Sequence, residues 1–433
     1  MLKTTDNNCG NFQIDKLHIP NIQIIANVNI GNLKVNDYPN LLVFPSNFNV
    51  YGDKISEEQI FSLHESILTT GNIMGFVGIN DSEIKIQSRF ANGDDDYFLH
   101  YMLQKVFSIN LFNLKHSSNR ETIFDFLLYL FPYYLKKALS QGLFKDYQKK
   151  ENNDANVRGT IVINRHIRQN IPFLGKIAYR TREHSYDNHI TQLVRHTIEH
   201  IRQHPFGGNI LNNDSDTQDC ITQIVSATPT YDRNRRNIFI NKNIKPFSHP
   251  FFLEYQNLQK ICLQILRYEG IKYGDEKDKV YGLLFDGAWL WEEYLNTILK
   301  DNGFKHPQNK TSKGAIYLFE GPKCKRFPDF WKDNIILDAK YKRLLGKEAE
   351  TIDRNDMHQI VSYMYVKQAK LGGFVFPSEE EKVETNAVSL GVLNGYGGEV
   401  KLWTVSIPQS TKTFIDFNSQ MQVNEKVLLR IIE

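Results

Sequence analysis

The sequence has few cysteines, and they are widely separated. Only four occur in 433 residues, and no two of them form a CxxC pair. This spacing excludes a disulfide framework and a zinc ribbon built from paired cysteines. We therefore expect a reducing, cytoplasmic setting.

Long apolar runs are also missing. The most lipid-like segment, 126–135, has ten residues and contains Pro132, whereas a membrane span needs roughly 20 apolar residues. The polar N-terminus lacks the apolar stretch of a secretion signal. We expect a protein with no place in a membrane.

The composition is typical of a globular protein. Hydrophobic residues make up 41%, charged residues 23% and aromatic residues 12%, which excludes collagen-like and disordered classes. The length exceeds that of an ordinary single core. We expect a multidomain α+β protein with a mixed, β-rich N-terminal region (1–115), a helical and basic middle region (116–275) and a C-terminal α/β region (280–433).

The net charge of +3 hides an uneven distribution. Residues 151–250 hold 13 basic and 9 acidic side chains, and residues 320–347 hold eight and four. Arginine forks match phosphate oxygens, so these zones indicate a polyanionic partner, with a solvated surface as the alternative. Within the first zone, Arg233, Arg235 and Arg236 are candidate DNA contacts or a solvated turn.

Local patterns predict strands and helices along the chain. The predicted strands lie at 41–44, 76–79 and 84–86. The predicted helices lie at 57–68, 121–140, 188–203, 249–269 and 353–370, with Pro132 kinking or splitting the second. Loops are predicted at 149–156 and 205–219.

Two clusters of polar residues invite a metal interpretation, which we do not favour. His196, His200 and His204 recur every four residues, but no further ligand completes a set, so we expect a polar helix face. Asp94, Asp95 and Asp96 lie too close together for a calcium loop, and we expect a solvated turn.

The chemically informative region is 282–377. It contains a predicted helix with Glu292 and Glu293, followed by a predicted hairpin that turns at Asp333-Asn334. Side chains two apart on a strand share a face, so Asp338 lies beside Lys340. If Asp329 projects nearby, two carboxylates and a lysine meet, which suits Mg²⁺ binding and phosphodiester hydrolysis. The alternative is an exposed ion pair at a strand end.

These residues resemble the PD-(D/E)XK nuclease superfamily. Pro328-Asp329 and Asp338-Ala339-Lys340 match its signature, and Gln359-x-x-x-Tyr363 is similar to a helix motif of some branches. The wider sequence resembles the McrC family of restriction subunits, including LlaJI-type enzymes. The resemblance covers roughly 120–377 and is carried by FDGAWLWEEYL, ILDAKYK and NDMHQIVSYMY.

The resemblance implies a fold and roles for named residues. It implies a restriction-endonuclease-like domain at 280–433, with Asp329 and Asp338 as Mg²⁺ ligands and Lys340 as the catalytic lysine. Glu292 matches the first acidic motif, with Glu293 as the neighbouring alternative. Gln359 and Tyr363 would support the site from the neighbouring helix. Apart from the resemblance, Lys342 and Arg343 of the second basic zone are candidate DNA contacts.

The resemblance also implies partners. Family members act on double-stranded DNA with an AAA+ GTPase subunit, to which the N-terminal region would dock. The chain has no GxxxxGK[ST] phosphate loop, so we expect another subunit to hydrolyse the nucleotide. We expect a restriction endonuclease subunit for phage defence, either methylation-dependent or, like LlaJI-type enzymes, site-specific with companion methyltransferases. The alternatives are a non-catalytic activator of the NTPase and a stand-alone repair nuclease.

Overall fold

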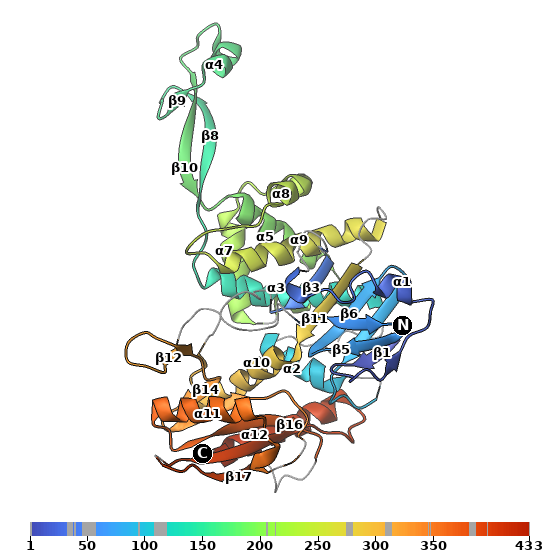
Figure 1. Ribbon diagram of the computed structural model, residues 1–433. Coiled ribbons are helices and arrows are strands. Elements are labelled where there is room, and N and C mark those ends of the chain that lie inside the picture. Colours follow the sequence, from blue (N-terminus) through green and yellow to red (C-terminus); the bar gives the residue numbers. More distant parts are fainter. Residues whose placement is uncertain are drawn as a thin grey trace. The chain divides into compact units, whose positions relative to one another are not determined.

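The chain folds into two compact units. The computed structural model describes residues 2–32, 38, 40–45, 58–93, 96–107, 119–204, 207–212, 214–273, 280–307, 314–344, 346, 348–380, 387–395 and 397–432. The first unit joins 1–113 to 276–433, and the second holds 114–275 (Figure 1). The architecture mixes separate sheets with separate helices, so the predicted multidomain α+β class is confirmed.

One five-stranded sheet combines strands from both chain segments of the first unit. Its order is β1 (Leu2–Thr5), β7 (Ser82–Gln87), β6 (Ile73–Ile79), β11 (Val280–Asp286) and β3 (Asn40–Phe44). The strands predicted at 41–44, 76–79 and 84–86 are confirmed here. A smaller sheet, β2 (Phe12–Gln13), β5 (Ile67–Thr70) and β4 (Phe61–His64), contributes Phe61, Leu63 and Leu68 to the same apolar core.

A second five-stranded sheet lies wholly in the C-terminal part. Its order is β14 (Phe330–Lys332), β15 (Ile335–Ala339), β16 (Leu371–Ser378), β18 (Glu399–Ser406) and β17 (Ala387–Val392). The three inner strands run parallel, and each outer strand is antiparallel to its neighbour. The predicted hairpin is therefore confirmed, and its turn residue Asp333 has a left-handed φ of 47°. Residues after 378 complete this sheet.

Besides the short α1 (Ile19–Ile22), the described part of the first unit contains four longer helices. They are α2 (Tyr97–Phe107), α10 (Gly287–Leu299), α11 (Arg354–Lys367) and α12 (Phe414–Ile432). Helix α11 packs on β15 and β16, whereas α12 packs on β18 and α2. The buried carboxylate of Glu425 accepts hydrogen bonds from Tyr101 at 2.7 Å and Tyr294 at 3.1 Å, so it ties α12 to α2 and α10.

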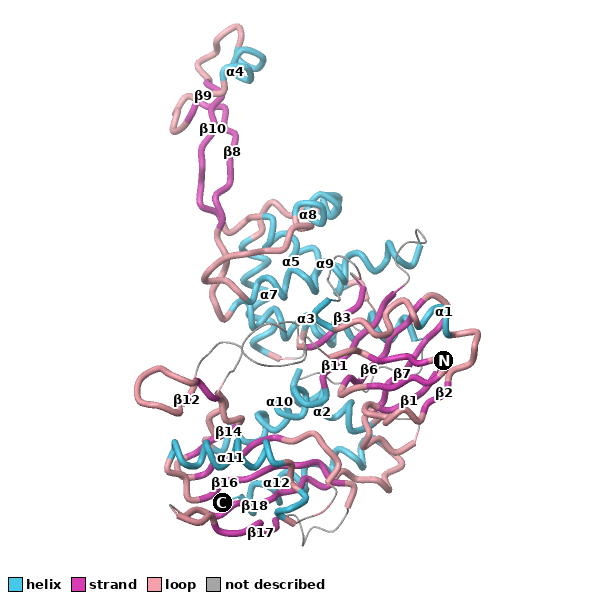
Figure 2. The backbone as a smooth tube through the Cα atoms, in the orientation of Figure 1, coloured by secondary structure: helices cyan, strands magenta, loops and turns pink. Residues whose placement is uncertain are grey.

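The second unit is a helical bundle with a long hairpin. Its longer helices are α3 (Asn119–Leu139), α5 (His189–Arg202), α7 (Ser215–Ala227) and α9 (Glu254–Tyr273), with short α6 (Gly207–Leu211) and α8 (Arg236–Lys242). The hairpin pairs β8 (Asp146–Asp154) with β10 (Ile177–Ser185) over nine residues. It reaches away from the helices of its unit and carries β9 (Thr160–Ile161) and α4 (Ile163–Asn170) near its far end (Figure 2).

Three local predictions are wrong. The predicted helix at 57–68 is, in its described part, the hairpin β4–β5, because Phe61 and Leu63 alternate on one strand and Glu65 turns the chain with a φ of 55°. The predicted loop at 149–156 lies largely in β8, where backbone pairing holds a mostly exposed polar strand. The predicted loop at 205–219 contains α6 and the start of α7, and Asp214 caps α7 by accepting from the Thr217 amide.

The remaining helix predictions are confirmed with adjustments. The helix predicted at 121–140 is α3, which continues past Pro132, so of the kink or split expected there the split is wrong. The helix predicted at 249–269 begins only at Glu254. No described helix has both the length and the apolar character that a membrane crossing requires.

Two polar clusters are also more buried than the sequence predicted. His196 is 3% exposed and packs on Tyr231 and Phe239, so it belongs to the core rather than to a polar face. Asp96 is fully buried and accepts from the backbone amides of Ser88 and Leu99, so it begins α2 rather than lying in a solvated turn. Asp94 and Asp95 lie outside the described residues.

Candidate active site

Two aspartates lie side by side on the β14–β15 hairpin. Asp329 directly precedes β14, and its Oδ2 accepts a hydrogen bond of 2.7 Å from the backbone amide of Ala339. Asp338 lies within β15 and is 1% exposed, and its charge raises the pKa of Asp329. The antiparallel register that pairs Phe330 with Leu337 brings the two carboxyls together.

Their closeness perturbs the ionisation of both carboxyls. Desolvation raises the pKa of Asp329 well above its usual range, and the charges of Asp338 and Glu292 raise it further. Desolvation also raises the pKa of Asp338, although Lys340 opposes this effect. Two carboxyls this close share a proton unless a cation neutralises them, so the pair suits a bound cation.

Lys340 completes the group as a fixed positive charge. Its Nζ lies 2.6 Å from Asp338 Oδ2 and 3.0 Å from Asp356 Oδ1. Desolvation lowers the pKa of Lys340, but the charges of Asp338 and Asp329 outweigh it and hold the pKa well above its usual value. Lys340 therefore stays protonated, and it can orient an anion or a water molecule but cannot accept a proton.

Glu292 is the glutamate of α10 whose charge affects the ionisation of Asp329. Its charge contributes to the raised pKa of Asp329, and its Oε1 lies 3.8 Å from Nε2 of His306. The other ring nitrogen of His306 lies 2.8 Å from the backbone oxygen of Asp329, and the ring stacks on Phe330 at 5.0 Å. Glu292 and Asp329 thus contact the same histidine.

Gln359 and Tyr363 support the chain just before Asp329. The Gln359 amide donates to the Tyr363 hydroxyl at 2.7 Å, and that hydroxyl donates to the backbone oxygen of Phe327 at 3.2 Å. Burial raises the pKa of Tyr363 to about 12, so the phenol keeps its proton for this bond. The pair therefore fixes the backbone directly before Pro328-Asp329.

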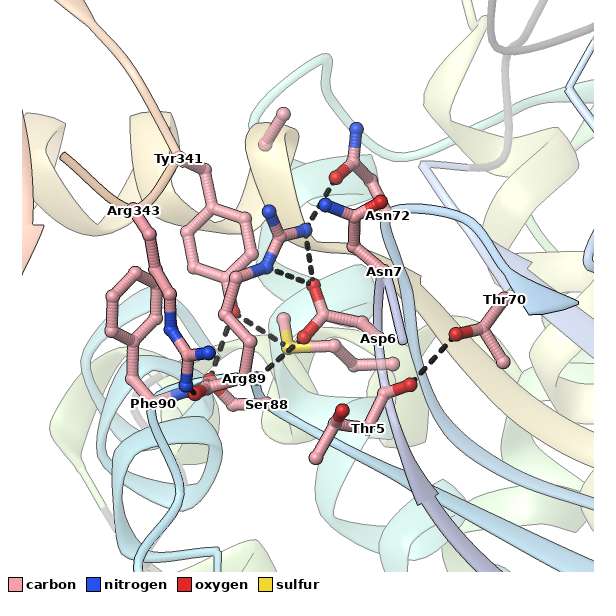
Figure 3. A network of polar contacts seen from close by, with 12 residues as sticks. Thr5, Asp6, Asn7, Thr70, Asn72, Ser88, Arg89, Phe90, Tyr341 and Arg343 are labelled. Carbon is pink, nitrogen blue, oxygen red and sulfur yellow. Dashed lines mark hydrogen bonds and ion pairs between the residues drawn. The ribbon is translucent and has the colours of Figure 1, made fainter. Parts of the chain in front are cut away.

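The segment after Lys340 is anchored to the first sheet of the same unit (Figure 3). The Tyr341 hydroxyl lies 2.8 Å from Ser88 Oγ, and the Arg89 guanidinium lies over the Tyr341 ring at 4.8 Å. Arg89 pairs in turn with the buried carboxylate of Asp6, and Arg343 donates to the backbone oxygen of Arg89. Through these contacts the first sheet holds the segment that follows β15 and begins with Lys340.

The candidate DNA contacts from the sequence all have partners within the protein. Lys342 pairs with Asp356 at 2.8 Å, and Arg343 pairs with Glu379 at 2.9 Å. The three arginines of the other cluster belong to the second unit, where Arg236 donates to the backbone oxygen of Leu266 in α9, Arg235 lies over the Phe239 ring, and Arg233 donates to Gln203. DNA contact by these five side chains stays a prediction.

Sequence reasoning did not single out Asp356 and His306. Asp356 lies in the first turn of α11, three residues before Gln359, a helical spacing that could have placed it on the same face. His306 belongs to no motif, and only the fold brings it to Asp329. Across the described ranges, no three His, Cys, Asp or Glu side chains form a ready-made metal cage.

The chain is similar to one protein family and to chains of two solved complexes. The model of the McrBC 5-methylcytosine restriction system component family matches residues 68–377. A chain from a refined half-complex of Thermococcus gammatolerans McrB AAA+ hexamers with bound McrC is 15% identical, with a TM-score of 0.49 and coverage of 100% of both chains. A chain from the cryo-EM structure of the Thermococcus gammatolerans McrBC complex is 13% identical, with a TM-score of 0.32 and coverage of 71% of this chain and 89% of that one. No curated protein matches.

Proposed function

Since the chain belongs to the McrBC 5-methylcytosine restriction system component family, we propose that it is the DNA-cleaving, McrC-type subunit of a methylation-dependent restriction system. The observation that carries the proposal is the meeting of Asp329, Asp338 and Lys340 on one hairpin. We further propose that the second sheet with α10 and α11 is a PD-(D/E)XK nuclease domain. Its parallel centre, its hairpin and the flanking glutamate helix support this assignment.

The paired carboxylates fit Mg²⁺ as the cofactor. Mg²⁺ prefers hard oxygen ligands and is usually held by one or two protein carboxylates while it keeps several waters. Asp329 and Asp338 would supply those carboxylates, and Glu292 adds negative charge beside them. When bound, the ion would lower the pKa of a water molecule and stabilise charge on the phosphate.

The protein's own residues contribute orientation and charge. Lys340, protonated and held by Asp338 and Asp356, would face the phosphate oxygens or the attacking water and offset the charge that develops there. The hydrogen bond from Ala339 fixes the orientation of the Asp329 carboxyl beside Asp338. The carboxylates and the lysine thereby act as one preorganised group.

We also propose that the subunit works with an AAA+ GTPase partner, as the family membership suggests. The second unit offers a surface that suits a protein partner. The end of its hairpin exposes Ile163 by 66%, Ile167 by 53% and Leu174 by 83%, although these side chains are apolar. A group of exposed apolar side chains at one place is more often a site of protein interaction than a part of the surface that only contacts water.

Cleavage of plasmid DNA tests the proposal. Methylated and unmethylated plasmids are incubated with the full chain, Mg²⁺ or EDTA, and the AAA+ partner with GTP or ATP. Asp338→Asn should lower the cleavage rate by a factor of about 100 or more, because it removes a proposed ion ligand and the charge that holds Lys340.

Asp333→Asn is the matched control, since Asp333 is an exposed acid in the turn of the same hairpin. It should cleave at the wild-type rate. The nuclease proposal fails if Asp338→Asn also cleaves at that rate, or if the wild-type chain with its partner cuts neither plasmid. Equal cleavage of both plasmids would contradict only the proposed dependence on methylation.

A further inference from the structure

A short ribbon projects from the first unit immediately before Asp329. Strands β12 (Ile316–Tyr317) and β13 (Lys325–Arg326) pair antiparallel, and the Leu318 amide continues the pairing to the Cys324 oxygen at 3.3 Å. Ile316 is 5% exposed and packs in the core beside α11. The ribbon is therefore packed at its root, whereas the rest extends away from β14 and α11 (Figure 1).

The ribbon exposes two aromatic rings. Phe319 is 65% exposed and Tyr317 is 37% exposed. A single exposed ring is ordinary on a protein surface, so these rings by themselves indicate no partner. Their meaning depends on the charges beside them.

The charges of the ribbon are mostly positive. Residues 316–326 contain Lys323, Lys325 and Arg326 against the single acid Glu320, and all four are exposed. Arg326 precedes Asp329 by only three residues, so this charge lies close along the chain to the proposed site of cleavage. The ribbon therefore holds an excess of positive charge in the part of the chain that leads directly to Asp329.

We propose that the ribbon is a DNA-contacting arm of the nuclease, an inference that rests on the function proposed above. Lys323, Lys325 and Arg326 contact backbone phosphates of the duplex beside the cleaved bond. Phe319 contacts a groove, where an apolar ring can pack against base edges or enter a base step. A positively charged strand pair with exposed rings fits a phosphate polyanion better than an apolar protein surface.

Binding of a short duplex measures this arm directly. The full chain is titrated onto a fluorescent methylated duplex of about 30 base pairs in Ca²⁺, which permits binding in place of Mg²⁺, over a series of salt concentrations. The logarithm of the association constant falls as the logarithm of the salt concentration rises, and each phosphate contact makes this slope steeper by about 0.9.

A triple variant should make that slope shallower by about 2–3 and weaken binding at least about tenfold. It carries Lys323→Gln, Lys325→Gln and Arg326→Gln. Phe319→Ala should weaken binding several-fold and leave the slope unchanged.

Lys16→Gln and Leu17→Ala are matched controls, because both side chains are exposed in the same unit and Leu17 is 82% exposed. Both should bind as the wild type does. All the altered side chains are exposed, so the variants should also unfold as the wild type does in urea.

Two results would overturn the inference. The first is a triple variant with the wild-type salt slope and affinity. The second is a set of variants that bind DNA normally but no longer bind the AAA+ partner, which would make the ribbon a protein interface. If the wild type cleaves DNA and the variants bind DNA as it does, only the proposal of a DNA-contacting arm fails. If the wild type never cleaves but its binding depends on the ribbon, the nuclease proposal alone fails.

Discussion

Replacing Arg89 by methionine tests whether the buried network behind Lys340 stabilises the first unit. The side chains of Asp6 and Arg89 are 0% and 6% exposed, and the Asp6 carboxylate accepts from the Arg89 backbone amide and from two of its guanidinium nitrogens. Removal of one partner from such a pair leaves a buried charge uncompensated and costs about 3–5 kcal/mol. We expect Arg89→Met to lower the free energy of unfolding by that amount.

The loss should depend on pH. Burial raises the pKa of Asp6 even with Arg89 beside it, and without Arg89 that pKa should rise further. A carboxyl whose pKa is higher in the folded than in the unfolded chain stabilises the fold at low pH, and this contribution is lost as the pH rises through the folded value. Arg89→Met should therefore be more destabilising at pH 8 than at pH 5.

Urea unfolding followed by tryptophan fluorescence measures this loss selectively. All four tryptophans, Trp289, Trp291, Trp331 and Trp403, lie in the first unit, so their fluorescence does not report on the second unit. Arg430→Met is the control, because Arg430 is exposed on α12 of the same unit. The double variant Asp6→Leu, Arg89→Met should recover part of the stability, since it leaves no charge unpaired.

The reasoning would be refuted by a loss below about 1 kcal/mol, which is the size of an ordinary surface effect. A loss that is equal at pH 5 and pH 8 would refute the electrostatic explanation and leave packing as the cause.

Two further predictions concern other buried groups. Burial raises the pKa of Asp96 to about 6, so the folded chain binds the proton more tightly and stability should fall by about 3 kcal/mol as the pH rises from about 4 to about 6. Asp96→Asn should flatten that slope in urea unfolding, and an unchanged slope would contradict it. Tyr363→Phe removes the hydroxyl that donates to Phe327. It should slow plasmid cleavage about tenfold at a cost of about 1 kcal/mol in stability, and an unchanged cleavage rate would show that this bond does not position Asp329.

The hairpin and the helix of the site were predictable because each is formed by residues of one short segment. The hairpin around Asp333 was predictable because two alternating apolar strands flank a turn, and the same pattern placed Asp338 beside Lys340. The helix with Gln359 and Tyr363 was predictable from its spacing, and the structure joins both side chains by a hydrogen bond. Strand β8 was missed because it is polar and exposed, so it lacks the alternation on which strand prediction depends.

Periodicity and turn residues predicted the elements that carry the site and their order, because both act between near neighbours. The tertiary structure alone shows that β11 joins a sheet with β3 and β6. It alone brings His306 to the backbone oxygen of Asp329 and Asp356 to Lys340, and it places Arg89 over the ring of Tyr341. These contacts join segments up to hundreds of residues apart. They follow from the burial of apolar faces against one another, and no local pattern of residues specifies which distant faces will meet.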